Sequence, residues 1–120
     1  MNCVVKTMIN LYTELDEISF IAGSMEYLEF EICDKNNKPV DLANMKSIMW
    51  QMAYLGDKDN PILVKNGVIF NGNCFKVVLD ANDTINLRGK FIHHPVITDE
   101  VGNIYKPAEG LINIVGAIKG

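Results

Sequence analysis

Two neighbouring stretches in which apolar residues alternate with others constrain the fold of this sequence most. They are "ISFIA" (18–22) and "MEYLEFEIC" (25–33), and Gly23-Ser24 separates them. Side chains point alternately to the two faces of a β-strand, so a period of two predicts strands that each bury one face. We therefore expect two strands here, followed by a turn at "DKNNK" (34–38).

Further strand patterns follow at short intervals, separated by Gly, Pro, Asn and Asp. "SIMWQMAYL" is rich in β-formers, although a helix of this length fits nearly as well. Roughly seven short strands with turn signals every 8–12 residues and almost no helix are typical of an antiparallel β-sandwich, an all-β fold. The later segments are "SIMWQMAYL" (47–55), "ILVK" (62–65), "VIF" (68–70), "CFKVVL" (74–79), "GKFIHHPVIT" (89–98) and "GLINIVGAI" (110–118).

Two Asn-Gly pairs flank the run "VIF". Asn66-Gly67 and Asn71-Gly72 are the strongest hairpin signals in the chain. Each predicts a positive φ that Gly and Asn supply more readily than other residues. The polar segment "DANDTINL" (80–87) predicts a short turn of helix.

The first 17 residues fit the two-residue period less well. They match a helical spacing and a strand equally, so we expect an N-terminal arm or first strand (1–17) before the sandwich (18–120). Both termini are rich in apolar residues, and an open sheet edge can add a strand from a partner. Either the termini contact other molecules or they pair within their own sandwich. The partner-binding candidates are Val4, Val5, Met8, Ile9, Leu11 and Tyr12.

Charge and hydropathy exclude several classes of function. The formal net charge is −4, whereas nucleic-acid and anionic-lipid binding usually require a basic face, so we expect neither nucleic acid nor membrane as a partner. No apolar run reaches the ~20 residues of a membrane span, and the start of the chain lacks a signal-peptide pattern. We therefore expect synthesis in the cytoplasm. Reduced cysteines are expected there, although a Cys33–Cys74 pair is an alternative.

Candidate catalytic and metal-binding residues are few. His93 and His94 are adjacent, so on a strand they face opposite sides, and we expect one inside and one exposed. Glu29 and Glu31 share a strand face, which allows a paired acid–base role, but a solvated strand face is the simpler interpretation. No catalytic residue, metal ligand or cofactor is predicted. Trp50 is expected in the core rather than exposed for sugar stacking.

The runs 18–42 and 79–105 resemble the immunoglobulin-like domains of tailed-phage particles, and most closely the amino-terminal domain of phage baseplate upper proteins. The shared pattern has Gly plus a small polar residue between strands, then Pro-x-Asp-Leu after a turn, and later Asp-Thr-x-x-Leu before a glycine and an aromatic. The residues of this chain that match it are Gly23-Ser24, Asp34, Pro39-Val40-Asp41-Leu42, Asp83-Thr84, Leu87, Gly89, Phe91, Asp99 and Gly102.

This resemblance implies an immunoglobulin-like sandwich and gives several residues a structural role. Asp83 or Thr84 would cap the helical turn, Leu87 would close the end of the sandwich, and Gly89 would let the chain enter the next strand. Phe91 stands where many members carry a tyrosine, so a phenol hydrogen bond is not available. The fold-defining set is Gly23, Pro39, Asp41, Leu42, Trp50, Asp83, Thr84, Leu87, Gly89 and Phe91.

The resemblance also implies a function. We expect a non-enzymatic structural or accessory protein of a tailed-phage virion, present in many symmetric copies and docked on capsid, neck, tail or baseplate proteins. The alternative is a carbohydrate-binding or host-adhesion module that uses exposed aromatic residues such as Tyr54 and Tyr105. A hydrolase that uses paired glutamates ranks below both.

Overall fold

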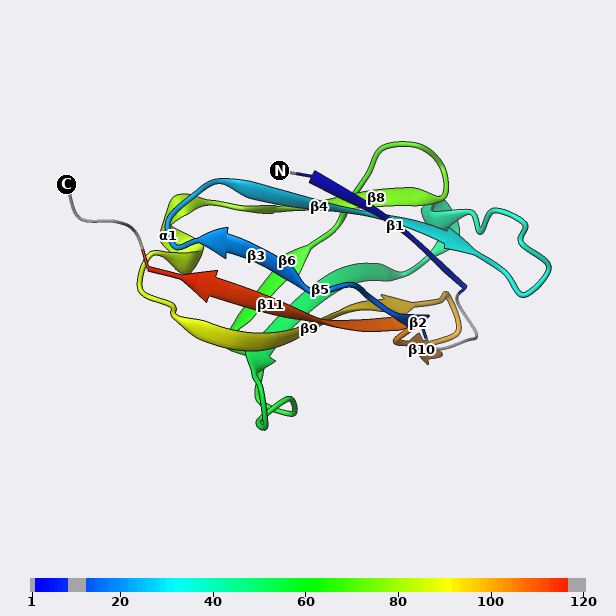
Figure 1. Ribbon diagram of the computed structural model, residues 1–120. Coiled ribbons are helices and arrows are strands. Elements are labelled where there is room, and N and C mark those ends of the chain that lie inside the picture. The colour runs from blue at the N-terminus through cyan, green and yellow to red at the C-terminus, as the bar shows by residue number, and fades with distance from the viewer. Residues whose placement is uncertain (1, 9–12, 117–120) are drawn as a thin grey trace.

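The protein folds into two β-sheets that pack face to face (Figure 1). The computed structural model describes residues 13–116 and the backbone of residues 2–8 of the 120-residue chain. The expected all-β sandwich is confirmed. The strands are β1 (Asn2–Met8), β2 (Thr13–Glu14), β3 (Ile18–Ile21), β4 (Glu26–Cys33), β5 (Ser47–Tyr54), β6 (Leu63–Asn66), β7 (Val68–Ile69), β8 (Cys74–Leu79), β9 (Gly89–Thr98), β10 (Ile104–Tyr105) and β11 (Ala108–Val115).

The strand order defines a small sheet, β1-β4-β8-β7, and a large sheet, β2-β11-β9-β5-β6, in which β3 also pairs with β11 and β10 with β9. Most pairs are antiparallel, as expected. The exceptions are the first three strands, because β1 runs parallel to β4, and β2 and β3 run parallel to β11. A tight hairpin forces neighbouring strands to be antiparallel, whereas strands joined by a longer path pair in either direction.

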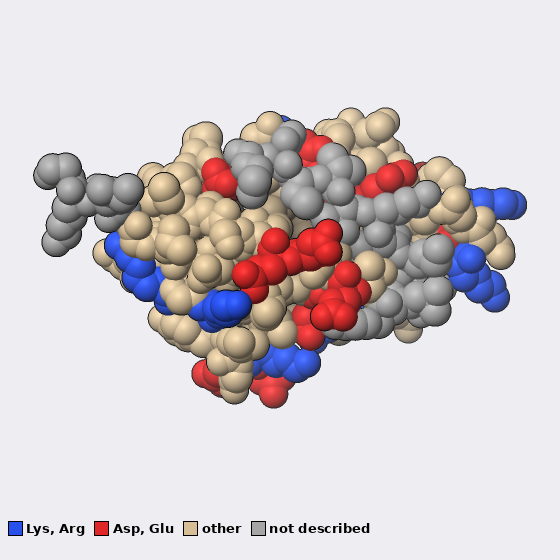
Figure 2. Space-filling view, in the orientation of Figure 1, with Lys and Arg blue, Asp and Glu red and all other residues tan. Residues whose placement is uncertain are grey.

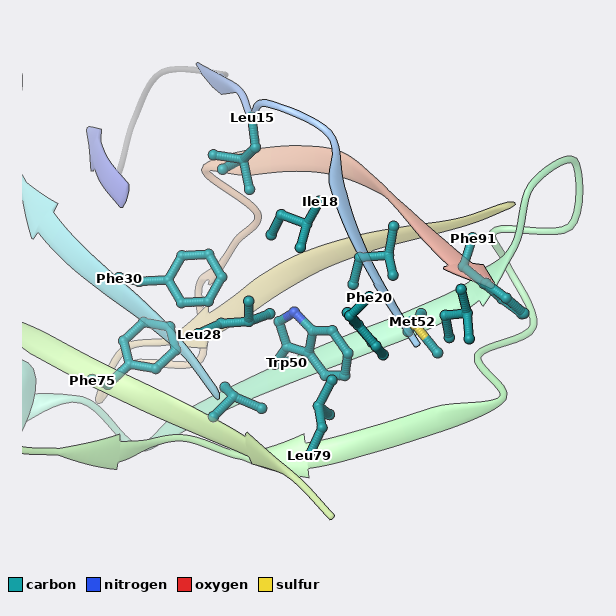
Figure 3. Packing of buried hydrophobic residues seen from close by; sticks show 14 of the residues in the cluster. Leu15, Ile18, Phe20, Leu28, Phe30, Trp50, Met52, Phe75, Leu79 and Phe91 are labelled. Atoms are coloured by element: carbon teal, nitrogen blue, oxygen red, sulfur yellow. The ribbon is translucent and has the colours of Figure 1, made fainter. Parts of the chain in front are cut away.

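The core fills the space between the two sheets (Figure 3). Trp50 of β5 lies in the middle of the cluster and is fully buried, so its predicted core position is confirmed. The rings of Phe30 and Phe75 stack with centroids 5.0 Å apart. Phe91 is also fully buried. A buried aromatic side chain contributes on the order of 2–3 kcal/mol, so these rings supply a substantial part of the burial energy.

Helical structure is limited, in the described residues, to two short turns: η1 (Leu42–Asn44) and α1 (Ala81–Thr84). Asp41 caps η1, since its carboxylate accepts the Ala43 N–H at 3.1 Å. Leu42 is fully buried, and its N–H donates to the Gly72 carbonyl at 3.0 Å. Pro39 forms an isolated bridge with Cys33 next to this turn. In the part of the chain that the structure describes, no helix is long and apolar enough to cross a lipid bilayer.

The α1 turn connects distant segments in a way that the sequence did not predict. Asp83 takes part in capping, because its carboxylate accepts the Asp80 N–H at 2.7 Å. Thr84 does not cap the turn. It is fully buried, and its Oγ1 accepts the Gly23 N–H at 3.0 Å, which ties α1 to the turn between β3 and β4. Gly23 has a φ of +82°, which favours glycine.

The start of β9 matches its predicted role. Gly89 has a φ of +99° and opens the strand, as expected for a residue that lets the chain turn into it. Leu87 is partly buried against the core just before it. The expected closure of this end of the sandwich by Leu87 is therefore consistent with its packing.

Gly67 has a different role from the predicted one. Gly72 adopts the expected positive φ of +65°, but neither Gly67 nor Asn66 has a positive φ. Instead, Gly67 carries the chain from β6 in the large sheet to β7 in the small sheet. A Cβ at this position would lie 2.6 Å from Cδ2 of Phe75, so glycine is needed for space and not for its backbone freedom.

Candidate interaction surfaces

The adjacent histidines of β9 are both buried, with exposed fractions of 1% for His93 and 7% for His94. The expectation that one of them is exposed is wrong. They do face opposite sides of the large sheet, but on the outer face His94 lies in a pocket whose lining also includes Lys58 and Lys106. The periodicity of a strand predicts which side a residue faces, and later parts of the chain decide whether that side is covered.

His93 faces the core and bonds to Trp50. The indole Nε1–H of Trp50 donates to Nδ1 of His93 at 3.0 Å. Burial, and secondarily the neighbouring His94, lower the pKa of His93 from 6.5 to about 4. The imidazole is therefore neutral near pH 7, and its proton must sit on Nε2 because Nδ1 accepts. Nε2 is buried and has no hydrogen-bond partner in the described structure.

His94 lies at a polar pocket of about 330 Å³ on the outer face of the large sheet. Its Nε2 is 3.2 Å from Oε1 of Gln51. Burial lowers the pKa of His94, and Lys106 and Lys58 lower it further, against the opposing effect of Glu109. Across the pocket, Lys58 and Glu109 form an ion pair of 3.4 Å. A neutral imidazole next to an internally compensated ion pair offers little net charge for binding a small ion.

The other candidates for chemistry have ordinary structural environments. Glu29 and Glu31 are half-buried on β4 and lie opposite Lys76 and Cys74 of β8. Within residues 13–116, no group of three or more His, Cys, Asp or Glu side chains is arranged to hold a metal ion. Free thiols are found at Cys33 and Cys74, as predicted. Burial, followed by the nearby Glu31, raises the pKa of Cys74.

Three of the six N-terminal candidates lie at an edge of the small sheet. Val4, Val5 and Met8 belong to β1, where they pair with Glu29, Phe30 and Cys33 of β4. The remaining candidates, Ile9, Leu11 and Tyr12, fall outside the described residues. β1 is an edge strand of the small sheet. Edge strands have unpaired backbone groups that a further strand can bind.

Acidic residues gather beside the first strands of the large sheet. Figure 2 shows these side chains in the middle of the face that carries β1, β3 and β11. Glu14, Asp16 and Glu17 are exposed there. A pocket of about 260 Å³ is lined by Glu14, Glu17 and Glu109. Lys90 compensates part of this charge, since its Nζ lies 3.0 Å from Oε1 of Glu17. The acidic charge on this side of the sandwich is therefore only partly compensated.

The opposite side of the sandwich is apolar. There β6 ends the large sheet and β7 ends the small sheet. We define the β6–β7 edge by the large apolar residues that are exposed on and beside these strands. The sequence predicted strands here but contained no signal that both were edge strands. These residues are Ile62, Val64, Val68, Ile69 and Phe70, with exposed fractions between 39% and 54%.

The tyrosines considered for sugar binding lie far from each other in the fold. Tyr54 is 48% exposed at the end of β5 and pairs with Phe91 at one end of β9. Tyr105 pairs with Ile97 near the other end of β9, and its hydroxyl donates to Asp99 at 3.2 Å. The two rings therefore do not form one aromatic surface.

These features define the chain as an all-β domain of two packed sheets with open edges. No family model matches the sequence, and no curated protein matches it. Among solved structures, the chain is similar to the N-terminal domain of phage TP901-1 ORF48, with a TM-score of 0.57 and 12% sequence identity. The similarity covers 96% of this chain and 99% of that domain. At this identity the likeness establishes a common fold.

Proposed function

We propose that the protein is a non-enzymatic structural or accessory component of a tailed-phage particle, docked on capsid, neck, tail or baseplate proteins. The observation that carries this proposal is the end-to-end likeness of the fold to a phage protein domain, over 96% of this chain and 99% of that domain. The sequence pattern of residues 18–42 and 79–105 supports it independently, because it resembles the amino-terminal domain of baseplate upper proteins.

The surface of the domain suits protein–protein contact. Both sheets have open edges, at β1 in the small sheet and at β6 in the large sheet. One side is acidic and the other apolar, so the two sides favour partners of different chemistry. Docking would then depend on apolar burial and strand pairing, with symmetry multiplying one contact over many copies.

The N-terminal segment is the candidate docking element, and the structure narrows its extent. Leu15 is only 8% exposed and belongs to the core cluster, so residues 13–17 are part of the packed body. A deletion of residues 1–12 is therefore a cleaner test of docking than a deletion of residues 1–17. We expect the shortened chain to fold and to be missing from particles, and full incorporation would contradict a docking role.

Absolute quantitative mass spectrometry of purified particles tests the function as a whole. Counting this chain against the major capsid protein distinguishes the locations, since icosahedral decoration requires on the order of hundreds of copies and a neck or baseplate ring about a dozen. Finding no copies in particles would reject the virion proposal.

The adhesion alternative has one observation in its favour, the exposure of Tyr54. Binding on a glycan array that is lost in Tyr54→Ala and retained in Tyr105→Ala would support it, because the two rings are remote. An array with no signal would argue against it.

A further inference from the structure

Both sheets end on the same side of the sandwich, at consecutive strands. β6 is the last strand of the large sheet and β7 the last strand of the small sheet. Gly67, which joins them, donates its N–H to the Ile48 carbonyl at 2.9 Å. The β6–β7 edge is thus one continuous surface, formed by the ends of two sheets.

This surface carries almost no charge. In the segment from residue 60 to residue 73, Lys65 is the single charged residue, although 22% of the whole chain is charged. The ammonium group of Lys65 lies 2.8 Å from Oδ2 of Asp83, and both side chains are largely buried. Natural edge strands usually carry exposed charges that prevent pairing with other strands. On the β6–β7 edge the single charge is largely withdrawn from solvent and paired within the chain, so this protection is weak.

Unpaired backbone groups also point out of this edge. The hydrogen bond between Gly67 and Ile48 shows which residues of β6 direct their backbone groups towards β5. Hydrogen-bonded positions alternate along an antiparallel pair. The backbone N–H and C=O groups of Lys65 therefore point towards β5, whereas those of Val64 and Asn66 point outward. The Phe70 N–H donates to the Cys74 carbonyl at 3.0 Å, which by the same alternation leaves the groups of Ile69 facing outward.

We propose that the β6–β7 edge is a homotypic interface, at which two copies of this chain pair edge to edge with β6 antiparallel to β6. A two-fold interface must be complementary to itself. A largely apolar edge strand with alternating donors and acceptors, whose one charge is paired with Asp83 of the same chain, meets this condition. The acidic side around Glu14, Asp16 and Glu17 does not, because like charges on two copies repel.

The pairing has a preferred centre at Val64. This register places Val64 opposite Val64 of the second copy, so the outward-facing N–H and C=O groups of the two Val64 residues meet. It also places Lys65 opposite Leu63 of the second copy and avoids a direct contact between two lysines. The proposal concerns self-association of this chain, and it does not rest on the proposed virion function.

The test is the molar mass of the full-length protein in solution, measured by sedimentation equilibrium over a concentration series. We expect a reversible monomer–dimer equilibrium with a Kd in the micromolar range. Val64→Lys would place two ammonium groups at the centre of the interface and raise the Kd by at least about tenfold. The matched control is Val101→Lys, because Val101 is 83% exposed in the turn between β9 and β10 and lies outside the edge. Its Kd is expected to equal that of the unmodified chain.

Two outcomes would overturn the proposal. The first is a monomer at all concentrations up to about 1 mM, since a weaker interface would contribute less than about 4 kcal/mol. The second is a dimer whose Kd is the same in Val64→Lys and Val101→Lys, because the interface would then lie elsewhere. Circular dichroism of both variants checks that a change in mass does not come from unfolding.

Discussion

Trp50 donates its indole N–H to Nδ1 of His93 at 3.0 Å in the interior of the sandwich. The bond joins neighbouring strands β5 and β9 of the large sheet. It satisfies the one polar atom in the side chain of the fully buried Trp50. A buried N–H without a hydrogen-bond partner would cost about 1–3 kcal/mol. The bond also requires a neutral imidazole, since a protonated His93 has no lone pair on Nδ1 to accept it.

The first prediction is that acid destabilises the protein through His93. Its pKa is about 4 in the folded state against 6.5 as a free side chain. Between these values the unfolded chain binds more protons than the folded one, so the free energy of unfolding falls as the pH falls from 6.5 towards 4. The loss from this group approaches about 3 kcal/mol. Urea unfolding at several pH values between 7 and 4 measures it.

The control for this effect is His93→Gln, which retains an acceptor for Trp50 but does not titrate. We expect a lower free energy of unfolding at pH 7 and a smaller decrease on acidification than in the unmodified protein. The carboxylates titrate in both proteins, so the difference between the two pH profiles isolates His93. Identical profiles would show that His93 does not cause the acid sensitivity.

The second prediction concerns the link between Thr84 and Gly23. Thr84→Val keeps the shape of the side chain but removes the oxygen that accepts the Gly23 N–H at 3.0 Å. The donor loses its partner in a partly buried site, which lowers the free energy of unfolding by about 1–2 kcal/mol. Thr84→Ser keeps the hydroxyl and serves as the control. Equal losses in the two variants would assign the effect to packing rather than to the hydrogen bond.

The third prediction is that Gly67→Ala destabilises the protein by steric overlap. The new Cβ would lie 2.6 Å from Cδ2 of Phe75 and 2.8 Å from Cγ2 of Ile48. Overpacking of this kind costs about 1–3 kcal/mol. The neighbouring Asn66→Ala is the control, because Asn66 is exposed. Thermal unfolding of both variants gives the comparison, and equal melting temperatures would contradict the proposed overlap.

The fourth prediction concerns residues 13–17. Leu15→Ala removes a side chain of the core cluster and lowers the free energy of unfolding by about 2–3 kcal/mol. Asp16→Ala, at the exposed neighbouring position, changes it by less than about 0.5 kcal/mol. Denaturant unfolding of the two variants tests this. A Leu15→Ala variant as stable as Asp16→Ala would show that these residues belong to a separable arm.

The alternation in residues 18–22 and 25–33 predicted strands and most of their buried side chains. It fails at Met25, which is 67% exposed, and at Glu26, which is only 8% exposed. Ile18, Phe20, Phe30 and Ile32 all face the core. Gly89 also took the expected position, with a positive φ at the start of β9. These features depend on local backbone geometry and on the alternation of side chains, both of which can be read from a few consecutive residues.

The candidate surfaces were much less predictable. Nothing in the sequence distinguished β6 and β7 from interior strands, because the exposed charges that usually mark edge strands are missing from them. The resemblance left Asp83 or Thr84 to cap the helical turn. Asp83 does so, whereas the hydroxyl of Thr84 accepts from Gly23, which lies 61 residues away. Strand alternation predicted that one of His93 and His94 is inside and the other exposed. His94 instead lies in a pocket that is also lined by residues from other segments of the chain.

By itself, the sequence determined an all-β domain whose strands each direct one apolar face inward, because a two-residue period has no other simple structural interpretation. Only the tertiary structure decided that β1, β2 and β3 pair in parallel, that Gly67 is needed for space, and that both sheets end together at an apolar edge. The physical reason is range. Periodicity is a property of consecutive residues, whereas strand partners, close packing and open edges arise from contacts between residues far apart in the chain.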